Sequence, residues 1–273
     1  MRQYVSHEPA RRWRTGFDRY IEIDRVLIMG VVNATPDSFS DGGRYNTAAA
    51  AAARAKELVR SGADIIDIGA QSTRPGFTVI GPDEELERIK AVLPGVADAL
   101  PRGFPISIDT FYPDVMRWAL EHGACMINDV SGLSNPDMRM LAAETGCGVI
   151  LMHFAYIAGI SRPSLCTAAI RSFFERRMEQ CITEEIDPEQ IVLDPGIGFG
   201  KTRAQEKYIL GHMSECRVFG RPLLAAASRK RVIREYYTDA AAPGEQELDE
   251  ATFAAHSEAV LSGAQLVRVH SVL

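Results

Sequence analysis

Polar and charged side chains stand at the carboxyl end of every short apolar run in the sequence. In chain order they are Asn33, Asp67, Asp109, Asn128 with Asp129, His153, Asp194, Ser228 with Lys230, and Arg268 with His270. Loops begin where strands end, so any single one of these residues could be polar for that reason alone. A polar residue at all eight ends instead predicts one convergent, charged pocket, because barrel enzymes build their active sites from strand ends and the loops that follow.

Four of these side chains suit a flat, nitrogen-rich ring. Asp109 and Asp194 offer carboxylate acceptors, Asn128 can both donate and accept, and Lys230 adds a donor. One carboxylate can accept two parallel hydrogen bonds from an amidine-like N–H/NH₂ edge. The set therefore suits a planar heterocycle that carries such an edge and a carbonyl. The same carboxylates could instead pair with Lys or Arg and only hold the barrel rim together, and the residues alone leave that alternative open.

Two hydroxyl-rich loops carry groups that an anion needs. Residues 33–43 read Asn-Ala-Thr-Pro-Asp-Ser-Phe-Ser-Asp-Gly-Gly, and residues 70–76 include Thr73 and Arg74. Arg268 and His270 are two residues apart on one strand, so they point to the same face and could add positive charge. Together these groups suggest a phosphate or pyrophosphate, although the first loop taken alone could be an ordinary turn.

The segment 194–202 ends in Gly-Lys-Thr, like a nucleotide-binding P-loop, but its spacing differs. A P-loop has four residues between its glycines, whereas Gly196 and Gly200 enclose three. We interpret these glycines as turns that allow the backbone to approach a flat ligand closely. The sequence shows no nucleophile elbow and no metal-ligand spacing. Catalysis must then rest mainly on positioning and charge stabilisation.

Short apolar runs alternate with longer amphipathic stretches, which is typical of repeated β-α units. The expected strands are 26–32, 64–68, 105–108, 124–127, 148–152, 191–193, 222–227 and 265–269, and the expected helices are 48–60, 83–99, 114–122, 137–144, 167–185 and 250–261. A weak repeat places Gly62, Gly123, Gly146 and Gly263 where helices must stop. We predict an α/β fold, a (βα)₈ TIM barrel.

The sequence also makes predictions for the two ends of the chain and for one long loop. Residues 1–25 form an N-terminal extension, in which the alternating segment 20–23 predicts one arm of a small hairpin that could plug the barrel floor, and residues 26–273 form the barrel itself. Residues 238–249, rich in Ala, Pro, Gly and acids, predict a solvated surface loop. The chain stops shortly after the eighth strand, so we expect the eighth helix to be missing or truncated.

Composition disfavours several classes of protein. The 273 residues are ample for a large core, and a formal charge of −6 gives no electrostatic drive toward nucleic acid. No apolar run approaches the roughly 18 residues of a membrane span. The five cysteines are far apart and form no C-x-x-C, which argues against a disulfide framework and a zinc site. We expect a soluble, cytoplasmic protein without nucleic-acid or membrane partners.

Eight ordered motifs resemble those of dihydropteroate synthase. They are the runs 30–43, 72–76, 107–110, 127–130, 151–153, 194–201, 228–230 and 268–270, and they span residues 26–270 near the family's spacing. The resemblance implies a transferase of folate biosynthesis and a sulfonamide target. Such an enzyme joins 6-hydroxymethyl-7,8-dihydropterin pyrophosphate to p-aminobenzoate and releases pyrophosphate and 7,8-dihydropteroate.

The resemblance also implies roles for single residues. The pterin ring would be bound by Asp109, Asn128, Asp194 and Lys230, with Arg268 stacking on it. The pyrophosphate would be held by Asn33, Thr73, Arg74, Arg268 and His270, with Mg²⁺ coordinated through Asn33 and phosphate oxygens. The p-aminobenzoate pocket would be shaped by Thr35, Pro36 and Ser228, while Asp37 would help to order the closed loops. The catalytic group would be Asn33, Asp109, Lys230, Arg268 and His270, in a homodimer formed through the last helices.

Departures from the family pattern keep two alternatives open. Gln71 stands where Glu is usual, Gln205-Glu206 replaces His-Asn, and Ser271 replaces Asp or Asn. These changes spare the principal pterin and phosphate residues but bear on sulfonamide sensitivity. One alternative is a corrinoid-linked pterin methyltransferase domain, which would lack Ser228-Arg229-Lys230. The other is a catalytically silent pterin-binding paralogue, motivated by Gln71 and the short C-terminus.

Overall fold

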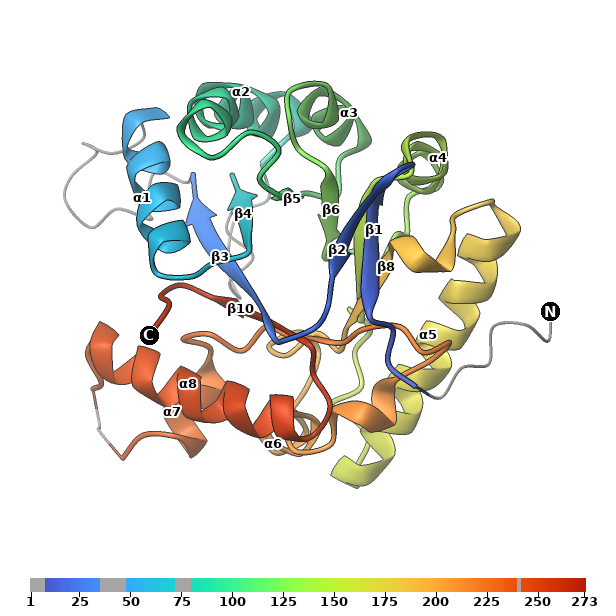
Figure 1. Ribbon diagram of the computed structural model, residues 1–273. Helices are drawn as coiled ribbons and strands as arrows, with labels where there is room; N and C mark the ends of the chain where they lie inside the picture. Colours follow the sequence, from blue (N-terminus) through green and yellow to red (C-terminus); the bar gives the residue numbers. More distant parts are fainter. Residues whose placement is uncertain (1–7, 35–47, 72–79, 240–241) are drawn as a thin grey trace.

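Parallel strands surrounded by helices form a nearly closed barrel in the computed structural model (Figure 1). The structure describes residues 8–34, 48–71, 80–239 and 242–273. Within these residues the sheet has eight strands in the order β8-β7-β6-β5-β4-β3-β10-β9. A single parallel bridge between Leu193 and Leu223 joins its two edges. The prediction of a (βα)₈ barrel is therefore confirmed.

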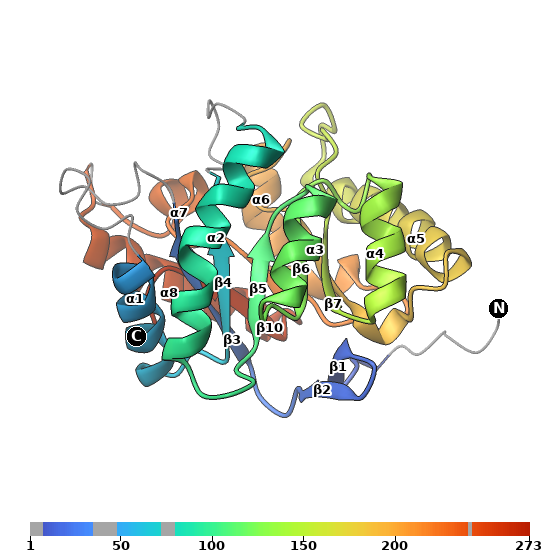
Figure 2. The ribbon, with the colours of Figure 1, turned by 90° about the horizontal axis from the view of Figure 1, so that it is seen from above.

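The eight predicted strands and six predicted helices are all observed, and the prediction missed the short helices α6 and α7. The barrel strands are β3 (Leu27–Asn33), β4 (Ile65–Gly69), β5 (Ile106–Asp109), β6 (Met126–Asp129), β7 (Gly148–Met152), β8 (Ile191–Asp194), β9 (Leu224–Ala225) and β10 (Leu266–Val269). The helices are α1 (Ala48–Arg60), α2 (Pro82–Ala99), α3 (Pro113–Glu121), α4 (Pro136–Thr145), α5 (Cys166–Thr183), α6 (Arg203–Leu210), α7 (Arg231–Tyr236) and α8 (Glu245–Leu261). The helices lie outside the strands (Figure 2), and β9 is shorter than expected.

Glycines end the helices as the repeat predicted. Gly62, Gly123, Gly146 and Gly263 have φ values of 108°, 105°, 64° and 124°. Side chains other than glycine rarely adopt this left-handed region. Each glycine therefore allows the chain to leave its helix and enter the next strand within a few residues.

The prediction of a surface loop over residues 238–249 is wrong in its second half, because α8 already begins at Glu245. The Glu247 side chain accepts a hydrogen bond of 3.0 Å from the backbone N–H of Gly244 and so caps the helix. Glu245 and Glu247 also favour a helix start through the helix dipole, and Leu248 is buried one turn later. Acidic composition alone does not distinguish a solvated loop from the first turn of a helix.

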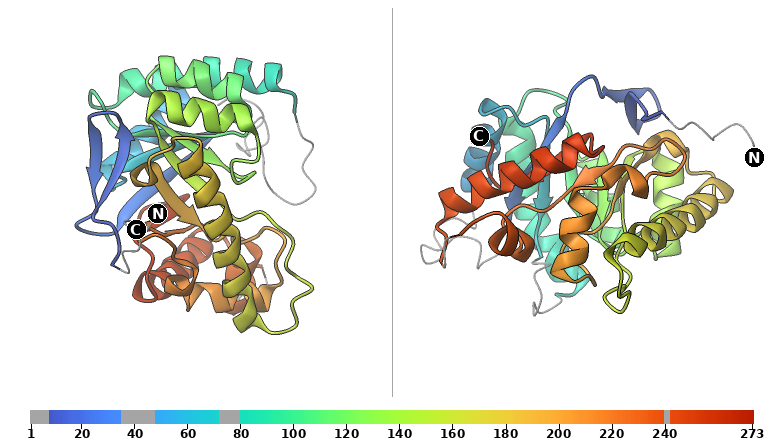
Figure 3. Two further views of the ribbon diagram at one scale, coloured as in Figure 1. Left: turned by 90° about the vertical axis from the view of Figure 1, so that its right-hand side faces the viewer. Right: turned by 90° about the horizontal axis from the view of Figure 1, so that it is seen from below.

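An N-terminal hairpin closes one end of the barrel (Figure 3). It consists of β1 (Arg12–Gly16) and β2 (Arg19–Glu22), paired antiparallel. The fully buried Trp13 packs among inward side chains such as Leu27 and Leu266, which stand at the starts of their strands. Its indole N–H donates to the carbonyl oxygen of Gln190 at 2.6 Å. The hairpin therefore seals the amino end of the barrel and leaves the opposite end for the site.

The C-terminal residues and the polarity of the helices are the remaining features of the fold. Residues 270–273 follow β10 and form no helix. In the part of the chain that the structure describes, no helix is both long and apolar enough to cross a membrane.

Candidate active site at the carboxyl end of the barrel

The inward face of the barrel changes from apolar to polar along its axis. Near the hairpin the interior holds apolar side chains, among them Ile65, Met126, Val192 and Leu266. Alternate residues of a strand face the same side, so the next inward positions on these four strands are Asp67, Asn128, Asp194 and Arg268. The carboxyl end of the barrel is therefore a polar pocket that rests on an apolar plug.

The guanidinium group of Arg268 lies at the centre of this pocket. Its Nε donates to Asp67 Oδ2 at 2.6 Å and its Nη2 donates to Asp109 Oδ2 at 3.0 Å. The Asn128 side-chain amide donates to the same Asp67 oxygen at 3.1 Å. Four strands thus contribute to one hydrogen-bonded network. The predicted residues Asp109, Asn128 and Arg268 come together here.

Asp67 is the residue to which the sequence assigned no role. It is fully buried, and among the described residues its Oδ1 has no hydrogen-bond partner. Asp67 ends an apolar run like the other site residues, but its partner Arg268 is 201 residues away in the chain. Asp67 is two residues from Ile65 on the same strand, so both side chains face the barrel interior. This alternation is the sequence signal that indicates Asp67 as a site residue.

Burial controls the charges of the network. It raises the pKa of Asp109 to about 7, assisted by the neighbouring carboxylates of Asp67 and Glu85 and opposed by Arg268. Asp67 and Asp109 both pair with Arg268 in this structure, whereas the alternative of a purely structural rim requires such a pair to be the only role of the carboxylate. A ligand that donates hydrogen bonds to Asp109 would relieve the cost of keeping that carboxylate ionised.

Asp194 and Lys230 form the opposite wall. Asp194 Oδ1 accepts from the backbone N–H of Gly196 at 2.7 Å. Lys230 Nζ donates to the carbonyl oxygen of Ile197 at 2.5 Å and lies 4.8 Å from the centre of the Phe199 ring. Burial raises the pKa of Asp194 and lowers that of Lys230 to about 8. This wall therefore offers one acceptor and one donor side by side.

Ser228 and His270 meet at the edge of the pocket. Ser228 Oγ lies 2.9 Å from His270 Nδ1 and accepts from the His270 backbone N–H at 3.1 Å. Between Ser228 and Lys230, Arg229 adopts a left-handed φ of 56°. Its guanidinium binds both oxygens of Asp249 on α8, at 2.7 and 2.8 Å. This ion pair fixes the turn that carries Ser228 and Lys230.

Five predicted site residues, Thr35, Pro36, Asp37, Thr73 and Arg74, lie outside the described residues. Asn33 is half-buried at the end of β3, where it pairs with Gly69. Gln71 lies two residues beyond the end of β4. Its Oε1 accepts from the backbone N–H of Ile80 at 2.8 Å, and its Nε2 donates to Glu85 Oε2 at 3.4 Å.

Two strand-end residues do not face the pocket, so the prediction of eight convergent ends is wrong for them. Asp129 accepts from the backbone N–H groups of Ser131 and Leu133, at 2.6 and 3.2 Å. Asp129 follows the inward-facing Asn128 on β6, so its side chain faces outward, where it stabilises the loop that follows the strand. His153 is buried beyond the end of β7, against Lys201 and the edge of Phe173.

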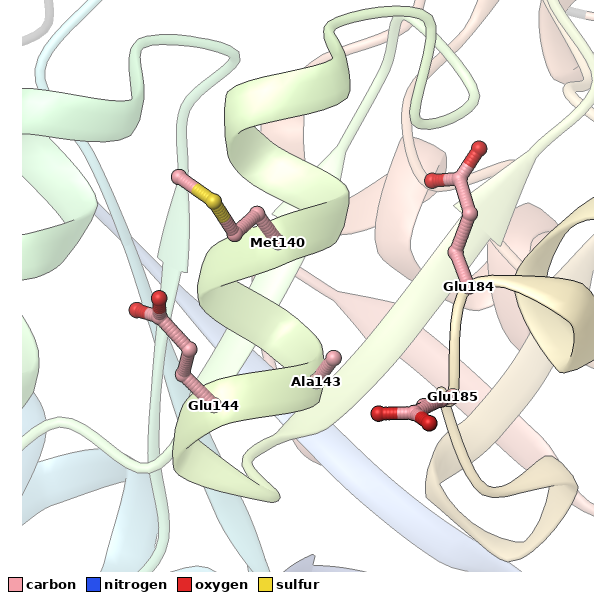
Figure 4. A pocket seen from close by; sticks show the side chains of 5 residues that line it. All are labelled: Met140, Ala143, Glu144, Glu184 and Glu185. Atoms are coloured by element: carbon pink, nitrogen blue, oxygen red, sulfur yellow. The ribbon is translucent and has the colours of Figure 1, made fainter.

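A separate hollow of about 430 Å³ lies on the outside of the barrel (Figure 4). It is lined by Met140, Ala143, Glu144, Glu184 and Glu185. These residues belong to α4 and to the turn after α5, and none of them stands at the carboxyl end of a strand. The hollow is therefore distinct from the candidate site.

The donor set limits how a metal could bind. Among the described residues, no group of three or more His, Cys, Asp or Glu side chains is arranged to hold a metal ion. Of the predicted ligands, the described part of the chain offers the Asn33 carboxamide oxygen. Such an oxygen suits Mg²⁺, which usually keeps several waters and binds substrate phosphates rather than a cage of protein ligands.

Comparison with known proteins gives concordant results. Residues 29–270 match the family described as pterin binding enzyme. The chain is 40% identical over 253 residues to a dihydropteroate synthase of Synechocystis sp., covering 91% of this chain and 86% of that protein. It is 38% identical to the structure of Xanthomonas albilineans dihydropteroate synthase with 4-aminobenzoic acid, with a TM-score of 0.85 over 96% of this chain and 93% of that one. It is 36% identical to the structure of Thermus thermophilus dihydropteroate synthase in complex with 6HMPPP, with a TM-score of 0.78 over 96% of this chain and 94% of that one.

Proposed function

The chain belongs to the dihydropteroate synthases, a family of pterin-binding enzymes, and on this premise we propose that it condenses 6-hydroxymethyl-7,8-dihydropterin pyrophosphate with p-aminobenzoate. The products are 7,8-dihydropteroate and pyrophosphate. One observation carries the assignment: Asp109, Asn128, Asp194, Lys230 and Arg268 share the polar end of the barrel. Relatives of this chain bind 4-aminobenzoic acid and 6HMPPP.

The pterin ring is the group that this pocket binds. Its amidine-like edge donates two hydrogen bonds to one carboxylate, and its carbonyl and ring nitrogens find donors in Lys230 and Asn128. The buried carboxylates of Asp109 and Asp194 have raised pKa values. Donors on the ring stabilise their ionised forms, so binding and ionisation reinforce each other.

The pyrophosphate leaves toward Arg268 and His270. The C–O bond breaks with its electron pair on the leaving oxygen, and the electron-rich pterin stabilises the cation that forms at the methylene carbon. Positive charge placed where negative charge develops lowers this barrier. The aryl amine then attacks that carbon, forms the C–N bond and loses one proton. No strong base is needed, because the amine carries a free lone pair.

Mg²⁺ would be held by the carboxamide oxygen of Asn33, by substrate phosphate oxygens and by water. When bound, it neutralises part of the charge of the leaving pyrophosphate. Thr73 and Arg74 would bind the same anion, Thr35, Pro36 and Ser228 would shape the p-aminobenzoate pocket, and Asp37 would help to order the closed loops. A sulfonamide would compete with p-aminobenzoate there.

The synthase is favoured over both alternatives. Ser228 and Lys230, which a corrinoid-linked methyltransferase domain would lack, are in place at the pocket. A silent paralogue would keep the pterin residues and lose the site of the leaving group. Here Arg268 lies on β10, where it also binds the Asp109 carboxylate, and His270 follows that strand directly.

We assign the enzyme to the cytoplasm and to a homodimer formed through α7 and α8. All five cysteines are free and buried, which suits a reducing compartment. Tyr236 on α7 and Phe253 and Leu261 on α8 are large apolar side chains exposed by 43%, 62% and 89%. Their exposure on neighbouring helices suits contact with a second copy.

Release of pyrophosphate tests the proposed reaction. The purified chain is mixed with the pterin pyrophosphate, p-aminobenzoate and Mg²⁺, and 7,8-dihydropteroate is identified by mass spectrometry. Stoichiometric pyrophosphate and dihydropteroate support the synthase. Tight binding of pterin without any turnover would establish the silent paralogue instead.

A further inference from the structure

The ammonium group of Lys201 is enclosed by the loop that follows β8. Its Nζ donates to the carbonyl oxygens of Gly196 and Phe199, both at 2.9 Å, and lies 3.0 Å from His153 Nδ1. The carbonyl oxygen of His153 is 3.3 Å from the same nitrogen. An ammonium group has three hydrogens to donate, so these partners use all of them. The lysine of the Gly-Lys-Thr motif thus binds backbone carbonyl groups of the protein itself.

His153 can act only as an acceptor in this contact. An ammonium group donates and never accepts, so the Nδ1 atom of His153 carries no proton. Burial, and then the nearby charge of Lys201, lowers the pKa of His153 to about 3. The edge of Phe173, with ring centres 4.9 Å apart, fixes the imidazole from another side. His153 is therefore a neutral partner at physiological pH.

The loop after β8 packs directly on the end of β7. Gly196 has a φ of 72°, and a Cβ atom there would collide with the carbonyl oxygen of His153. No other residue fits this position without moving the backbone. Further along, the backbone N–H of Ile157 donates to the carbonyl oxygen of Gly200 at 2.8 Å. The two loops form one unit with the Lys201 ammonium between them.

The backbone that Lys201 holds also positions the pterin-facing groups. The N–H of Gly196 binds the Asp194 carboxylate, the carbonyl of Ile197 binds the Lys230 ammonium, and the Phe199 ring lies beneath that ammonium. Lys201 binds the carbonyls on either side of this segment, at Gly196 and Phe199. A shift of the segment would therefore move an acceptor and a donor of the pocket together.

We propose that Lys201 is a positioning residue for the pterin site, whose ammonium fixes residues 196–199 and thereby the Asp194 carboxylate and the Lys230 ammonium. The inference rests on the proposed function, because it concerns binding of the pterin ring. Lys201 does not touch the ring. It acts through the loop backbone and through its charge.

The charge of Lys201 should affect how pterin binding depends on pH. Asp194 faces three cations, namely Lys230 before α7, Lys201 in its own loop and Arg268 on β10, and each of them opposes the effect of burial. Lys201 in turn faces the carboxylates of Asp194 and Glu206, which favour its charge, and the ammonium of Lys230, which opposes it. The buried thiol of Cys216 and the imidazole of His153 are both neutral near pH 7. Removal of the Lys201 charge must raise the pKa of Asp194. A pterin that needs the ionised carboxylate then binds only at higher pH.

The test compares Lys201→Met with Lys201→Arg by calorimetric titration of 6-hydroxymethylpterin between pH 5 and pH 8. We expect Lys201→Met to weaken binding at least tenfold at pH 7 and to move the acid limit of binding to higher pH. Lys201→Arg keeps the cation and should recover part of both losses. Equal affinity of wild type and Lys201→Met across the pH range would overturn the proposal, as would an arginine variant no better than the methionine variant.

The matched control is Lys207→Met. Lys207 lies on α6 and binds Glu258 of α8 and the hydroxyl of Tyr237, which follows α7. This variant also replaces a hydrogen-bonded Lys by Met, so it reports loss of an ion pair away from the pocket. We expect its pterin affinity to stay within twofold of wild type. A loss as large as that of Lys201→Met would overturn the assignment of a specific role to Lys201.

A second measurement is independent of pterin binding and of the folding of Lys201→Met. In wild-type protein labelled with ¹⁵N-histidine, His153 should remain neutral down to about pH 4, with Nδ1 as the unprotonated nitrogen. Protonation of His153 near its ordinary pKa would mean that the Lys201 contact is absent, and the proposal would fall. If wild type binds no pterin at all, the proposed function fails, whereas the protonation state of His153 Nδ1 still decides whether the Lys201 contact forms.

Discussion

Arg268 and Asp67, 201 residues apart in the chain, form the ion pair at the centre of the pocket, with Nε and Oδ2 separated by 2.6 Å. Asp67 also accepts from Asn128, and Arg268 also donates to Asp109. The pair therefore connects the last strand of the barrel to three strands of its first half. In the proposed reaction the same guanidinium receives the leaving pyrophosphate, so its orientation is set before substrate arrives.

Asp67→Ala tests this pair. The substitution leaves the buried Arg268 with Asp109 and removes the acceptor of Asn128, and loss of one partner of a buried pair typically costs about 3–5 kcal/mol of unfolding free energy. Urea denaturation measures this loss. Arg25→Ala serves as a control, because it breaks the exposed pair with Asp64 and should change stability little. Equal effects of the two substitutions would contradict a central role for Asp67.

Asp194→Asn tests the pterin assignment. The asparagine keeps the oxygen that accepts from Gly196, so the loop stays in place while the charge is lost. A hydrogen bond to a charged group contributes about 1.5–3 kcal/mol, and we expect pterin affinity to fall by roughly 10- to 150-fold. Isothermal titration calorimetry measures the affinity. An unchanged dissociation constant would remove Asp194 from the binding site.

Pterin affinity should fall as the pH rises through about 8. Burial lowers the pKa of Lys230 to about 8, so above this pH the side chain is neutral and loses its charge-assisted hydrogen bond to the ring. Lys230→Met should bind weakly at every pH and show a smaller alkaline decline. Titrations at pH 7.0 and pH 9.5 measure the effect. Constant wild-type affinity over this range would show that the charge of Lys230 is not used.

Glu85 makes the fold less stable at high pH. Burial raises the pKa of Glu85 from 4.5 to about 7. The folded state therefore holds a proton that the unfolded state has released between these values, and stability falls as pH rises through this window. Glu85→Gln should remove this decline and stabilise the protein at pH 8 by about 3 kcal/mol, as measured by urea denaturation at pH 5 and pH 8. A decline of the same size in the variant would assign it to another group, such as Asp109.

The strands and the inward polar residues were predictable from sequence because both are local. A short apolar run ending in Asp or Asn fixes a strand and its carboxyl end, and parity then assigns Asp109 and Asn128 to the interior. Pairings between distant segments were not predictable. Nothing near Lys201 indicates that its partner is His153, and nothing near Asp67 indicates Arg268.

Short helices were also beyond local reasoning. Thr202 caps the start of α6: its hydroxyl accepts from the Gln205 backbone N–H, and the Gln205 side chain accepts from the Thr202 backbone N–H. The same Gln205 side chain donates to the carbonyls of Ile157 and Ile160 in the loop after β7. A tertiary contact therefore stabilises this helix, and its eight residues carry too weak a periodic signal to predict it.

A crystal structure of the protein with 6-hydroxymethyl-7,8-dihydropterin pyrophosphate and Mg²⁺ tests the central claim most directly. We predict that the pterin ring lies at the carboxyl end of the barrel in hydrogen-bond contact with Asp109, Asn128 and Asp194, with its pyrophosphate against Arg268 and His270. A ring bound away from these side chains, or a pyrophosphate that contacts neither Arg268 nor His270, would contradict it.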